Sequence, residues 1–384
     1  MARRTTTSPF PDRLRALRAA ISDAGGDVAI VSNPTDVGYL TGFLGGDSWL
    51  VVGPSGKPLL ISDRRYEEEL GAFKPIVRVA MRDGAMAGAV ADALAELSPA
   101  GGRGKAASKG PVLVLQSDHL TLAMDKTLRG AFRKAKVKLR VKPVSGLVGE
   151  LRLVKDAGEI ALMRKAIRIQ EAALLEVMPT IRAGETELDV RARLEAAMTS
   201  RGSATPAFET IIASKGNAAL PHYRPDATKI KANQCLLIDY GATWKGYLGD
   251  ITRTFTLGRW PKAVREVYEI VNEAHEAAVD VIRDGVACRD VDAAAREVIR
   301  KAGFAKAFNH SLGHGIGMDV HEMPRLSSQA GKDEVLRAGH VVTIEPGIYL
   351  PGVGGVRLED DYAVTERGAT KLSSLPRDLD WATL

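Results

Sequence analysis

Four acidic residues share an unusual setting, because each lies beside an apolar run that predicts a buried strand. They are Asp239, Asp250, Glu345 and Glu359. A buried carboxylate is costly unless it is paired with a cation or bound to a metal. Two divalent cations neutralise four such charges, lower the pKa of bound water and hold a carbonyl oxygen. One such acid alone is most often a salt bridge at a strand end, but four at matching places in two hairpins indicate a two-metal hydrolytic centre.

Histidines gather near these acids. Three of the seven, His310, His314 and His321, lie within one glycine-rich run, and His222 precedes the first predicted hairpin. Glycines let the backbone come close to a ligand or to a neighbouring strand. Their spacing is not a dinucleotide fingerprint, and no helix is predicted to open there. The other three are interpreted as surface residues without function: His119, His275 and His340.

A duplicated unit is predicted to position these residues. The run Ile181–Gly184 returns roughly 100 residues later as Ile282–Gly285, which indicates an internal repeat. Each copy lies between two amphipathic helices, expected at 156–178 and 188–200, then at 262–282 and 291–302. Each half ends in a hairpin, expected at 235–239 with 250–257, and at 340–345 with 356–364. Pairing about the turn near Trp244 is expected to set Asp239 opposite Asp250, and the hairpins should face each other across a pseudo-two-fold axis.

The preceding part of the chain alternates strand and helix patterns. It predicts a smaller α/β domain at 1–146, before a catalytic domain at 147–384. In Lys134–Lys142 basic and apolar residues alternate, which is typical of a half-buried edge strand protected by its charges. No aromatic residues interleave with these charges, as stacking on bases would require. Nucleic acid is therefore not an expected partner, although the net charge is +6.

Compartment and membrane association are also constrained by the sequence. No run of about 18 apolar residues occurs, so no membrane span or membrane partner is expected. The basic amino terminus is not followed by the continuous apolar stretch of a signal peptide. Two scattered cysteines, Cys235 and Cys288, favour a reducing compartment. The expected location is the cytoplasm.

The carboxy-terminal part resembles the pita-bread metallopeptidases, in the branch of prolidase and aminopeptidase P. Four pieces carry this resemblance: Pro221–Tyr223, the pair Asp239 and Asp250, the run His310–Glu322 (HSLGHGIGMDVHE), and Glu345–Tyr349 followed by Val356–Asp360. The amino-terminal part resembles the creatinase-type domain of that branch through Tyr39–Phe43 (YLTGF). The implied fold class is α+β, with a duplicated helix–helix–β-hairpin catalytic domain behind a smaller α/β creatinase-like domain.

The resemblance implies two divalent metal ions held by five ligands: Asp239, Asp250, His314, Glu345 and Glu359. Asp250 and Glu359 would bridge the ions, Asp239 would bind one alone, and His314 with Glu345 would complete the other. This oxygen-rich set with one imidazole favours manganese or cobalt, and leaves zinc and iron open.

The resemblance also implies roles around the metals. Glu345 is the expected general base, His321 the donor to the scissile carbonyl or its oxyanion, and His222 the contact near the leaving proline. His310 and Tyr349 are expected to line the site. Arg357, two residues before Glu359, shares its strand face by period two and is expected to orient ligands or substrate.

The implied reaction is removal of an amino-terminal residue in front of proline. An X–Pro bond has no N–H and a ring-fixed geometry, which general peptidases do not accommodate. Aminopeptidase P is favoured, with Xaa-Pro dipeptidase (prolidase) as the alternative. The choice depends on a basic side chain that captures a dipeptide carboxylate, which the sequence does not single out.

Other readings are less consistent with the residues. Methionine aminopeptidases usually lack the arginine at 357 and an amino-terminal domain of this size, and creatinase has lost the metal ligands. A C–N hydrolase of a small non-peptide substrate is an open alternative. A non-catalytic binding protein on the same fold is disfavoured by the intact ligand set. A homodimer is expected by analogy with the family.

Overall fold

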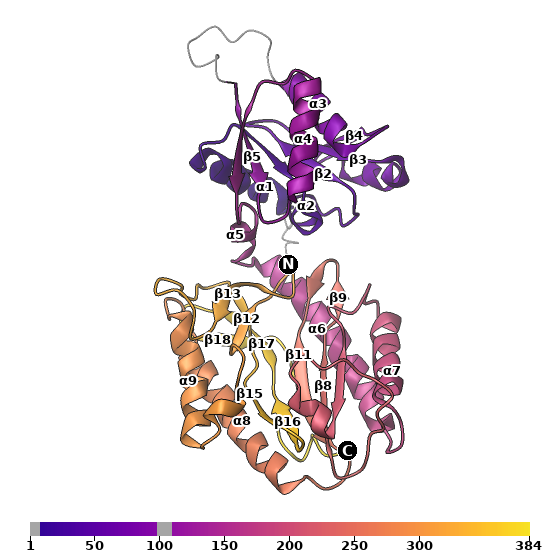
Figure 1. Cartoon of the computed structure of the whole chain (residues 1–384), viewed down its shortest axis with the longest axis vertical. Coiled ribbons are helices and arrows are strands. Elements are labelled where there is room, and N and C mark those ends of the chain that lie inside the picture. The colour runs from indigo at the N-terminus through magenta and orange to yellow at the C-terminus, as the bar shows by residue number, and fades with distance from the viewer. Residues whose placement is uncertain (1–7, 98–109) are drawn as a thin grey trace, which may run out of the picture. The chain divides into compact units, whose positions relative to one another are not determined.

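The computed structural model describes residues 8–97 and 110–384 of the chain. Two compact units divide it, Met1–Arg152 and Leu153–Leu384 (Figure 1). The sequence places the boundary between residues 146 and 147, ahead of the short helix α5 (Gly149–Arg152), which the structure keeps in the first unit. Within the described ranges, no helix is long and apolar enough to cross a membrane.

The first unit is built on a mixed six-stranded sheet with strand order β4-β3-β2-β1-β5-β6. The strands are β1 (Val28–Val31), β2 (Trp49–Val52), β3 (Leu59–Ser62), β4 (Arg78–Met81), β5 (Val112–Gln116) and β6 (Arg140–Val144). The helices are α1 (Phe10–Asp23), α2 (Pro34–Thr41), α3 (Met86–Leu97) and α4 (Leu122–Lys134). Every residue of β1, β2 and β5 is buried, as the continuous apolar runs of central strands predict.

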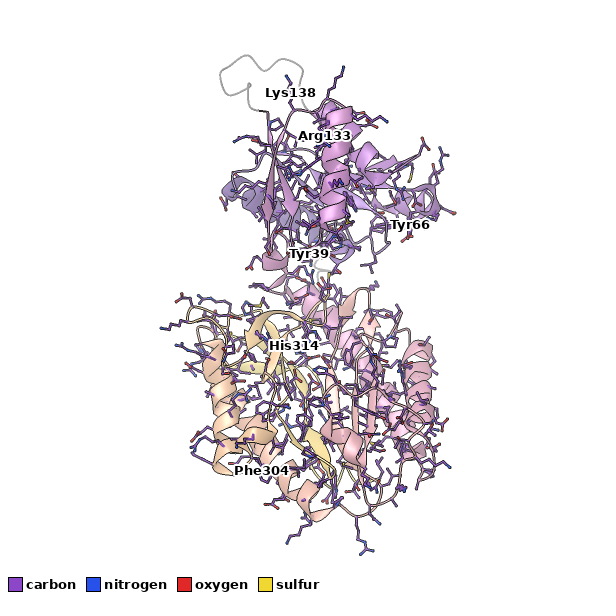
Figure 2. All side chains as sticks on the ribbon, in the orientation of Figure 1. Tyr39, Tyr66, Arg133, Lys138, Phe304 and His314 are labelled. Carbon is purple, nitrogen blue, oxygen red and sulfur yellow. The ribbon has the colours of Figure 1, made fainter. Side chains whose placement is uncertain are left out.

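The strand expected over Lys134–Lys142 from its alternating basic and apolar residues begins later than predicted. Helix α4 runs through Arg133 to Lys134, and β6 begins only at Arg140, so Lys138 lies in the connection (Figure 2). Of the expected strand, Lys134 is therefore the last residue of a helix that buries Leu128 and Phe132. β6 is nevertheless an edge strand of the sheet, where charged side chains discourage further strand pairing.

The second unit contains the expected duplication. Its helices pair as α6 (Ala157–Val177) with α7 (Glu187–Ser200), and α8 (Lys262–Val281) with α9 (Cys288–Lys301). Capping boxes begin the first pair, through Asp156 with Glu159 and Thr186 with Asp189, which satisfies backbone donors that a helix start leaves unpaired. The sheets between the pairs have the orders β11-β8-β7 and β13-β12-β14-β17-β18.

Ten strands form these two sheets and a two-stranded ribbon. They are β7 (Ile211–Ser214), β8 (Cys235–Tyr240), β11 (Ile251–Thr256), β12 (Gly313–Gly315), β13 (Glu322–Leu326), β14 (Val341–Ile344), β17 (Asp360–Val364), β18 (Ala369–Lys371) and the ribbon β15 (Gly347–Leu350) with β16 (Gly354–Arg357).

The register of the first hairpin differs from the expected one. β8 and β11 are antiparallel, but Asp239 pairs with Thr252, so Asp250 lies two residues away from the opposed position. The excess length forms a small ribbon, β9 (Thr243–Trp244) with β10 (Tyr247–Leu248). Its turn holds Lys245 at φ 51° and Gly246 at φ 80°, a left-handed pair that suits a tight ribbon turn.

The second hairpin is interrupted. β14 pairs with β17, matching Ile344 with Asp360, and the ribbon β15–β16 is inserted between them. The strand expected over 356–364 is therefore two strands that separate at Leu358 and Glu359. At this break the backbone bonds to the first sheet instead, because the Glu359 N–H donates to the Thr252 carbonyl of β11 at 3.1 Å. Glu345 and Glu359 occupy the next position of the β14–β17 register.

The surface interpretation is wrong for two of the three remaining histidines. His275 is fully buried on α8 and contacts the Leu358 carbonyl (3.1 Å) and the Tyr362 hydroxyl (3.0 Å). His340 is buried as well. Burial lowers the pKa of His275 to about 3, so the ring stays neutral inside the core. Its spacing from the buried Tyr268 and Val271 placed it on the apolar stripe of its helix.

Candidate metal centre

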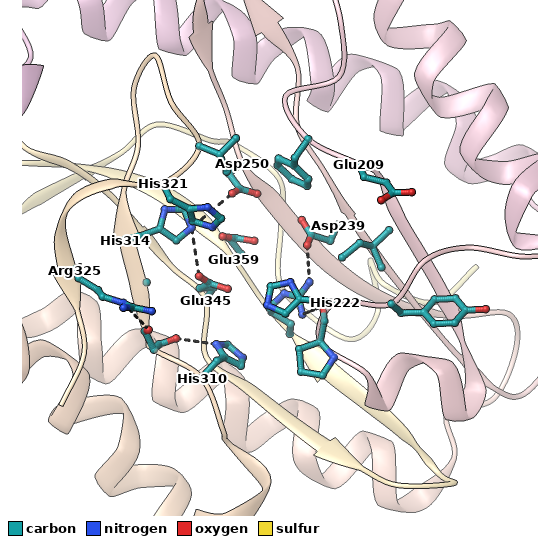
Figure 3. Close-up of a pocket in the computed structure, with 18 of the residues that line it drawn as sticks. Glu209, His222, Asp239, Asp250, His310, His314, His321, Arg325, Glu345 and Glu359 are labelled. Atoms are coloured by element: carbon teal, nitrogen blue, oxygen red, sulfur yellow. Dashed lines mark hydrogen bonds and ion pairs between the residues drawn. The ribbon is translucent and has the colours of Figure 1, made fainter. Parts of the chain in front are cut away.

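The strand ends of the second unit bring the predicted ligands into one cluster (Figure 3). Asp250, His314 and Glu359 each offer a ligand atom, and these atoms lie within 4.8 Å of one another. The His314 Nε2 is also 3.5 Å from Glu345 Oε1 and 3.9 Å from Asp250 Oδ2. A mixed set of carboxylates and one imidazole at such spacing is suited to divalent cations.

The pKa values of the clustered carboxyl groups also indicate a site for cations. Burial, and then the neighbouring Glu359 and Asp239, raise the pKa of Asp250 well above its usual value. Burial and Glu359 also raise the pKa of Glu345 well above its usual value. Burial, and then Asp239, raise the pKa of Glu359 to about 8. Like charges held together in a dry site resist ionisation. Divalent cations relieve that repulsion and stabilise the ionised form of all these carboxylates.

Two carboxylate oxygens provide a direct test of fit. Asp239 Oδ1 and Asp250 Oδ1 are buried and have no hydrogen-bond partner within the described part of the chain. Buried polar atoms are rarely left unpaired, and both atoms belong to the carboxylate set of the cluster. The donors present therefore fit divalent metal ions.

Outer contacts hold the carboxylates in place. Arg357 Nη2 donates to Asp239 Oδ2 at 2.6 Å, and Thr252 Oγ1 donates to Glu359 Oε2 at 2.6 Å. Asp361 Oδ2 accepts the backbone N–H of Asp250 at 3.0 Å. Such partners fix the orientation of metal-binding groups. Sequence reasoning named Arg357 but missed Thr252, although the D-x-T alternation from Asp250 places its side chain on the same strand face.

A chain of hydrogen bonds connects Arg357 to His310. Arg357 Nη1 donates to the Tyr349 hydroxyl at 2.9 Å, and that hydroxyl lies 2.9 Å from His310 Nε2. Burial, and then the charge of Arg357, lower the pKa of His310 to about 3. A neutral His310 accepts the Tyr349 hydroxyl proton, so all three side chains are oriented by one another.

One cavity of about 740 Å³ is lined by every predicted site residue except Tyr349, which lies behind His310 and Arg357. His321 is exposed and lines this cavity, and its ring centroid is 4.4 Å from that of His314. His222 lines the cavity from the segment before the first hairpin. The volume is within the range of small-ligand pockets.

Arg325 on β13 also lines this cavity and was missed by sequence reasoning. The sequence contains the pattern that could have found it, because His321, Met323 and Arg325 alternate, and alternate residues of a strand share a face. Within the described residues, the side chain of Arg325 meets no carboxylate and reaches only the Ser311 hydroxyl, at 3.3 Å.

The glycines of the His310–Glu322 run serve close packing between strands. A Cβ at Gly313 would lie 2.0 Å from the Thr343 carbonyl oxygen, and one at Gly315 would lie 2.1 Å from the Met323 carbonyl oxygen. Both distances exclude any side chain. The glycines therefore bring the strand that carries His314 against its two neighbours, β13 and β14.

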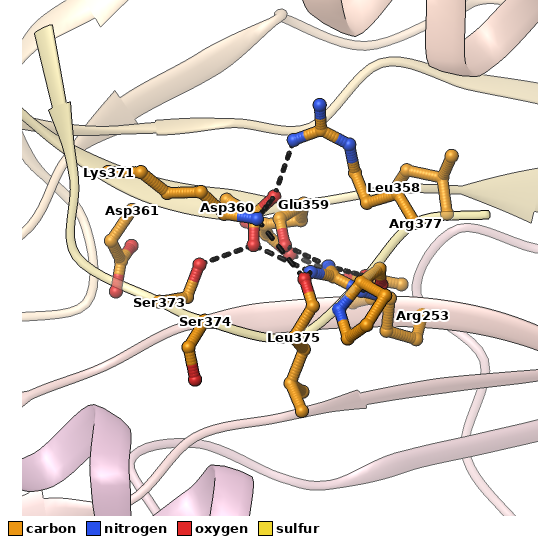
Figure 4. A network of polar contacts seen from close by, with 12 residues as sticks. Arg253, Leu358, Glu359, Asp360, Asp361, Lys371, Ser373, Ser374, Leu375 and Arg377 are labelled. Carbon is orange, nitrogen blue, oxygen red and sulfur yellow. Dashed lines mark hydrogen bonds and ion pairs between the residues drawn. The ribbon is translucent and has the colours of Figure 1, made fainter. Parts of the chain in front are cut away.

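A second polar network lies behind the cluster, around the fully buried Asp360 (Figure 4). Its carboxylate is 2.7 Å from Arg253 Nη2, 2.8 Å from Arg377 Nη1 and 3.0 Å from Lys371 Nζ. Arg253 also donates to the Glu359 carbonyl at 2.6 Å and to the Leu375 carbonyl at 2.9 Å. The network ties the backbone of a predicted ligand to the carboxy-terminal segment.

Comparison with known proteins agrees with this architecture. Residues 161–366 match metallopeptidase family M24, and residues 13–154 match the creatinase/prolidase N-terminal domain. An Xaa-Pro dipeptidase of Pyrococcus horikoshii is 40% identical over 247 residues, which cover 64% of this chain and 70% of the relative.

Two solved structures are similar over both units. An Xaa-Pro dipeptidase from Bacillus anthracis has a TM-score of 0.88 at 33% identity, covering 96% of this chain and 99% of the other. An X-Pro aminopeptidase from Thermotoga maritima has a TM-score of 0.84 at 33% identity, covering 94% of this chain and 99% of the other. These matches confirm the predicted two-domain fold and the resemblance.

Proposed function

This chain belongs to metallopeptidase family M24, in the branch of prolidase and aminopeptidase P, and from that premise we propose that it is an Xaa-Pro dipeptidase. The family depends on a dinuclear metal centre. The sequence alone favoured aminopeptidase P, with the dipeptidase as the alternative. The relatives named as Xaa-Pro dipeptidases favour that alternative, and aminopeptidase P is the second candidate because of the T. maritima structure.

The observation that carries the proposal is the placement of Arg325. A dipeptide ending in proline presents a carboxylate next to the ring, whereas a longer peptide presents a neutral carbonyl there. Arg325 offers a guanidinium to the cavity without a carboxylate partner among the described residues. Guanidinium and carboxylate form paired, charge-assisted hydrogen bonds. Arg325 is therefore suited to capture the carboxylate of a two-residue substrate.

The proposed mechanism divides the work between the metals and the chain. When bound, two divalent ions lower the pKa of water and polarise the scissile carbonyl. Asp239, Asp250, His314, Glu345 and Glu359 would hold them. Glu345 accepts the proton of the attacking water, and His321 donates to the oxygen that gains charge. His222 contacts the substrate near the leaving proline, while the ordered chain of Arg357, Tyr349 and His310 shapes the wall of the cavity.

Replacing Arg325 with Met should raise KM for an Xaa-Pro dipeptide by about 10–100-fold, the range expected for losing hydrogen bonds between charged groups. Hydrolysis of an Xaa-Pro-Yaa tripeptide should change little, because it has no carboxylate at that place. Initial rates of Ala-Pro and Ala-Pro-Ala on both proteins measure this. Arg224→Met is the matched control, since Arg224 lines the same cavity but is paired with Glu209 (3.2 Å). A wild-type preference for the tripeptide would favour aminopeptidase P.

Replacing His321 with Ala should lower kcat by about 10²–10³, the usual effect of removing one donor to a developing oxyanion. KM and metal content should change little, because the interaction is made only in the transition state. Kinetics, elemental analysis and the melting temperature, measured on one preparation, check this together. A loss explained by missing metal or by a lower melting temperature would make His321 a structural residue.

Three finer features stay predictions. Manganese is the favoured metal, with cobalt, zinc or iron as alternatives. A homodimer and a cytoplasmic location are expected on the grounds given by the sequence and the family.

A further inference from the structure

A buried ion pair lies behind the loop that ends at His321. Lys155 Nζ is 2.8 Å from Glu322 Oε2, and the two side chains are only 1% and 6% exposed. Removing two charges from water is unfavourable, and an apolar pair of the same size often stabilises a fold at least as well. Such a pair is best explained when it fixes one particular arrangement of the backbone.

The partner of Lys155 holds the loop directly. Glu322 Oε1 accepts the backbone N–H groups of Met318 (3.0 Å) and Asp319 (3.1 Å). A Cβ at Gly317 would lie 2.9 Å from Glu322 Oε2 and 2.9 Å from Lys155 Cε. The backbone at Gly317 therefore packs directly against the ion pair, and any side chain there would require the ion pair to shift.

The loop is also fixed on its other side. The Gly317 carbonyl accepts the N–H of Leu248 at 2.9 Å, and Leu248 belongs to the ribbon just before Asp250. The segment 317–321 thus lies between the first hairpin and the ion pair, and it delivers His321 to the cavity. Glu322 lines the cavity next to His321, whereas Lys155 does not.

We propose that Lys155 is a positioning residue, whose ammonium orients the Glu322 carboxylate so that the loop 317–321 holds His321 at the reacting carbonyl. The proposal rests on the proposed function for its catalytic consequence only. Lys155 touches neither the cavity nor the metal ligands, so its effect on catalysis passes through Glu322 and the loop.

Hydrogen exchange tests the structural step without any substrate. In Lys155→Met, amide exchange of a peptide covering 316–322 should rise by roughly tenfold or more, because the loop loses a charge-fixed acceptor. Exchange of the core strand β8 should be unchanged. Lys371→Met is the control, because Lys371 is also a lysine paired with a buried carboxylate, that of Asp360 (3.0 Å). Unchanged loop exchange in Lys155→Met, or an equal rise in Lys371→Met, would overturn the proposal.

Kinetics test the catalytic step. Lys155→Met should lower kcat for an Xaa-Pro dipeptide by about 10–10²-fold, since displacement of a catalytic group by about 1 Å has effects of this size. KM and metal content should stay near those of the wild type. In the His321→Ala background, the same change should lower kcat by less than about twofold, because residues that act through one another are not additive. Full multiplication of the two effects would show that Lys155 acts by another route.

Two further cases have their own tests: poor folding of Lys155→Met, and a wild-type protein without peptidase activity. If Lys155→Met folds poorly, the double variant Lys155→Met/Glu322→Gln removes both buried charges and should recover stability, while loop exchange stays raised. Wild-type exchange and wild-type kcat in that variant would contradict the proposal. If the wild-type protein hydrolyses no Xaa-Pro peptide, the proposed function fails, but the exchange measurements still decide the role of Lys155.

Discussion

Asp250→Asn should bind markedly less metal than the wild type and lose at least about 10³-fold in kcat/KM, because metal-borne stabilisation of the transition state amounts to several kcal/mol. Asp250 Oδ2 is 3.9 Å from His314 Nε2, and the Asp250 Oδ1 is buried without a hydrogen-bond partner in the described residues. An amide keeps the shape of this group but removes the charge that two ions would share. Elemental analysis after reconstitution with manganese should give nearly two ions per wild-type chain and far fewer in the variant.

The same substitution should act in the opposite direction on the metal-free protein. The pKa of Asp250 is raised by burial and by Glu359, so folding takes up a proton, and stability falls as pH rises above the ordinary carboxyl pKa of about 4. Asn removes that penalty. At pH 8 the metal-free variant should melt above the metal-free wild type, by roughly 2–4 °C for each kcal/mol of repulsion relieved.

Asp333→Asn is the control for both measurements, because Asp333 is an exposed acid in the same unit. It should leave metal content and melting temperature unchanged. Retention of two ions by Asp250→Asn would remove Asp250 from the bridging position. A metal-free variant that melts below the wild type would mean that the acid cluster is not electrostatically strained.

The metal-binding candidates could be predicted from sequence because their chemistry conflicts with their surroundings. Asp239 and Glu345 end apolar strands, and a carboxylate there needs a cation wherever the strand lies. The pairing register of the strands could not be predicted from the sequence. The ribbon β9–β10 shifted Asp250 away from Asp239, and the ribbon β15–β16 divided a strand that alternation presented as continuous.

Substrate choice could not be predicted because it depends on contacts that are distant in sequence. Arg325 becomes a candidate substrate-binding residue only when β13 is known to line the cavity that holds the four carboxylates. Lys155 becomes a candidate positioning residue only when its ion pair with Glu322, which is distant in sequence, is known. Both are ordinary basic residues among the 53 lysines and arginines of the sequence. The proposal of a dipeptidase therefore rests on the placement of Arg325 and on the similar proteins, not on any sequence motif.

The network around Asp360 should be the most sensitive point for folding outside the metal ligands. Asp360→Ala removes the carboxylate that is paired with Arg253, a side chain with no exposed surface. Leaving one partner of a buried pair uncompensated costs about 3–5 kcal/mol. Burial alone would raise the pKa of Asp360, but Arg253, Lys371 and Arg377 hold it well below its usual range. The carboxylate is therefore charged at neutral pH.

Urea unfolding of the second unit, followed by tryptophan fluorescence, measures the effect of Asp360→Ala on stability. Metal content should fall too, because Arg253 also donates to the Glu359 carbonyl. The double variant Arg253→Met/Asp360→Leu should recover much of the loss, since Arg377 and Lys371 are partly exposed and can turn to solvent. Glu297→Ala is the surface control, as its ion pair with Arg300 is half-exposed and contributes about 0–1 kcal/mol. Stability of Asp360→Ala within about 1 kcal/mol of the wild type, equal to that surface control, would show that the buried network contributes little to folding.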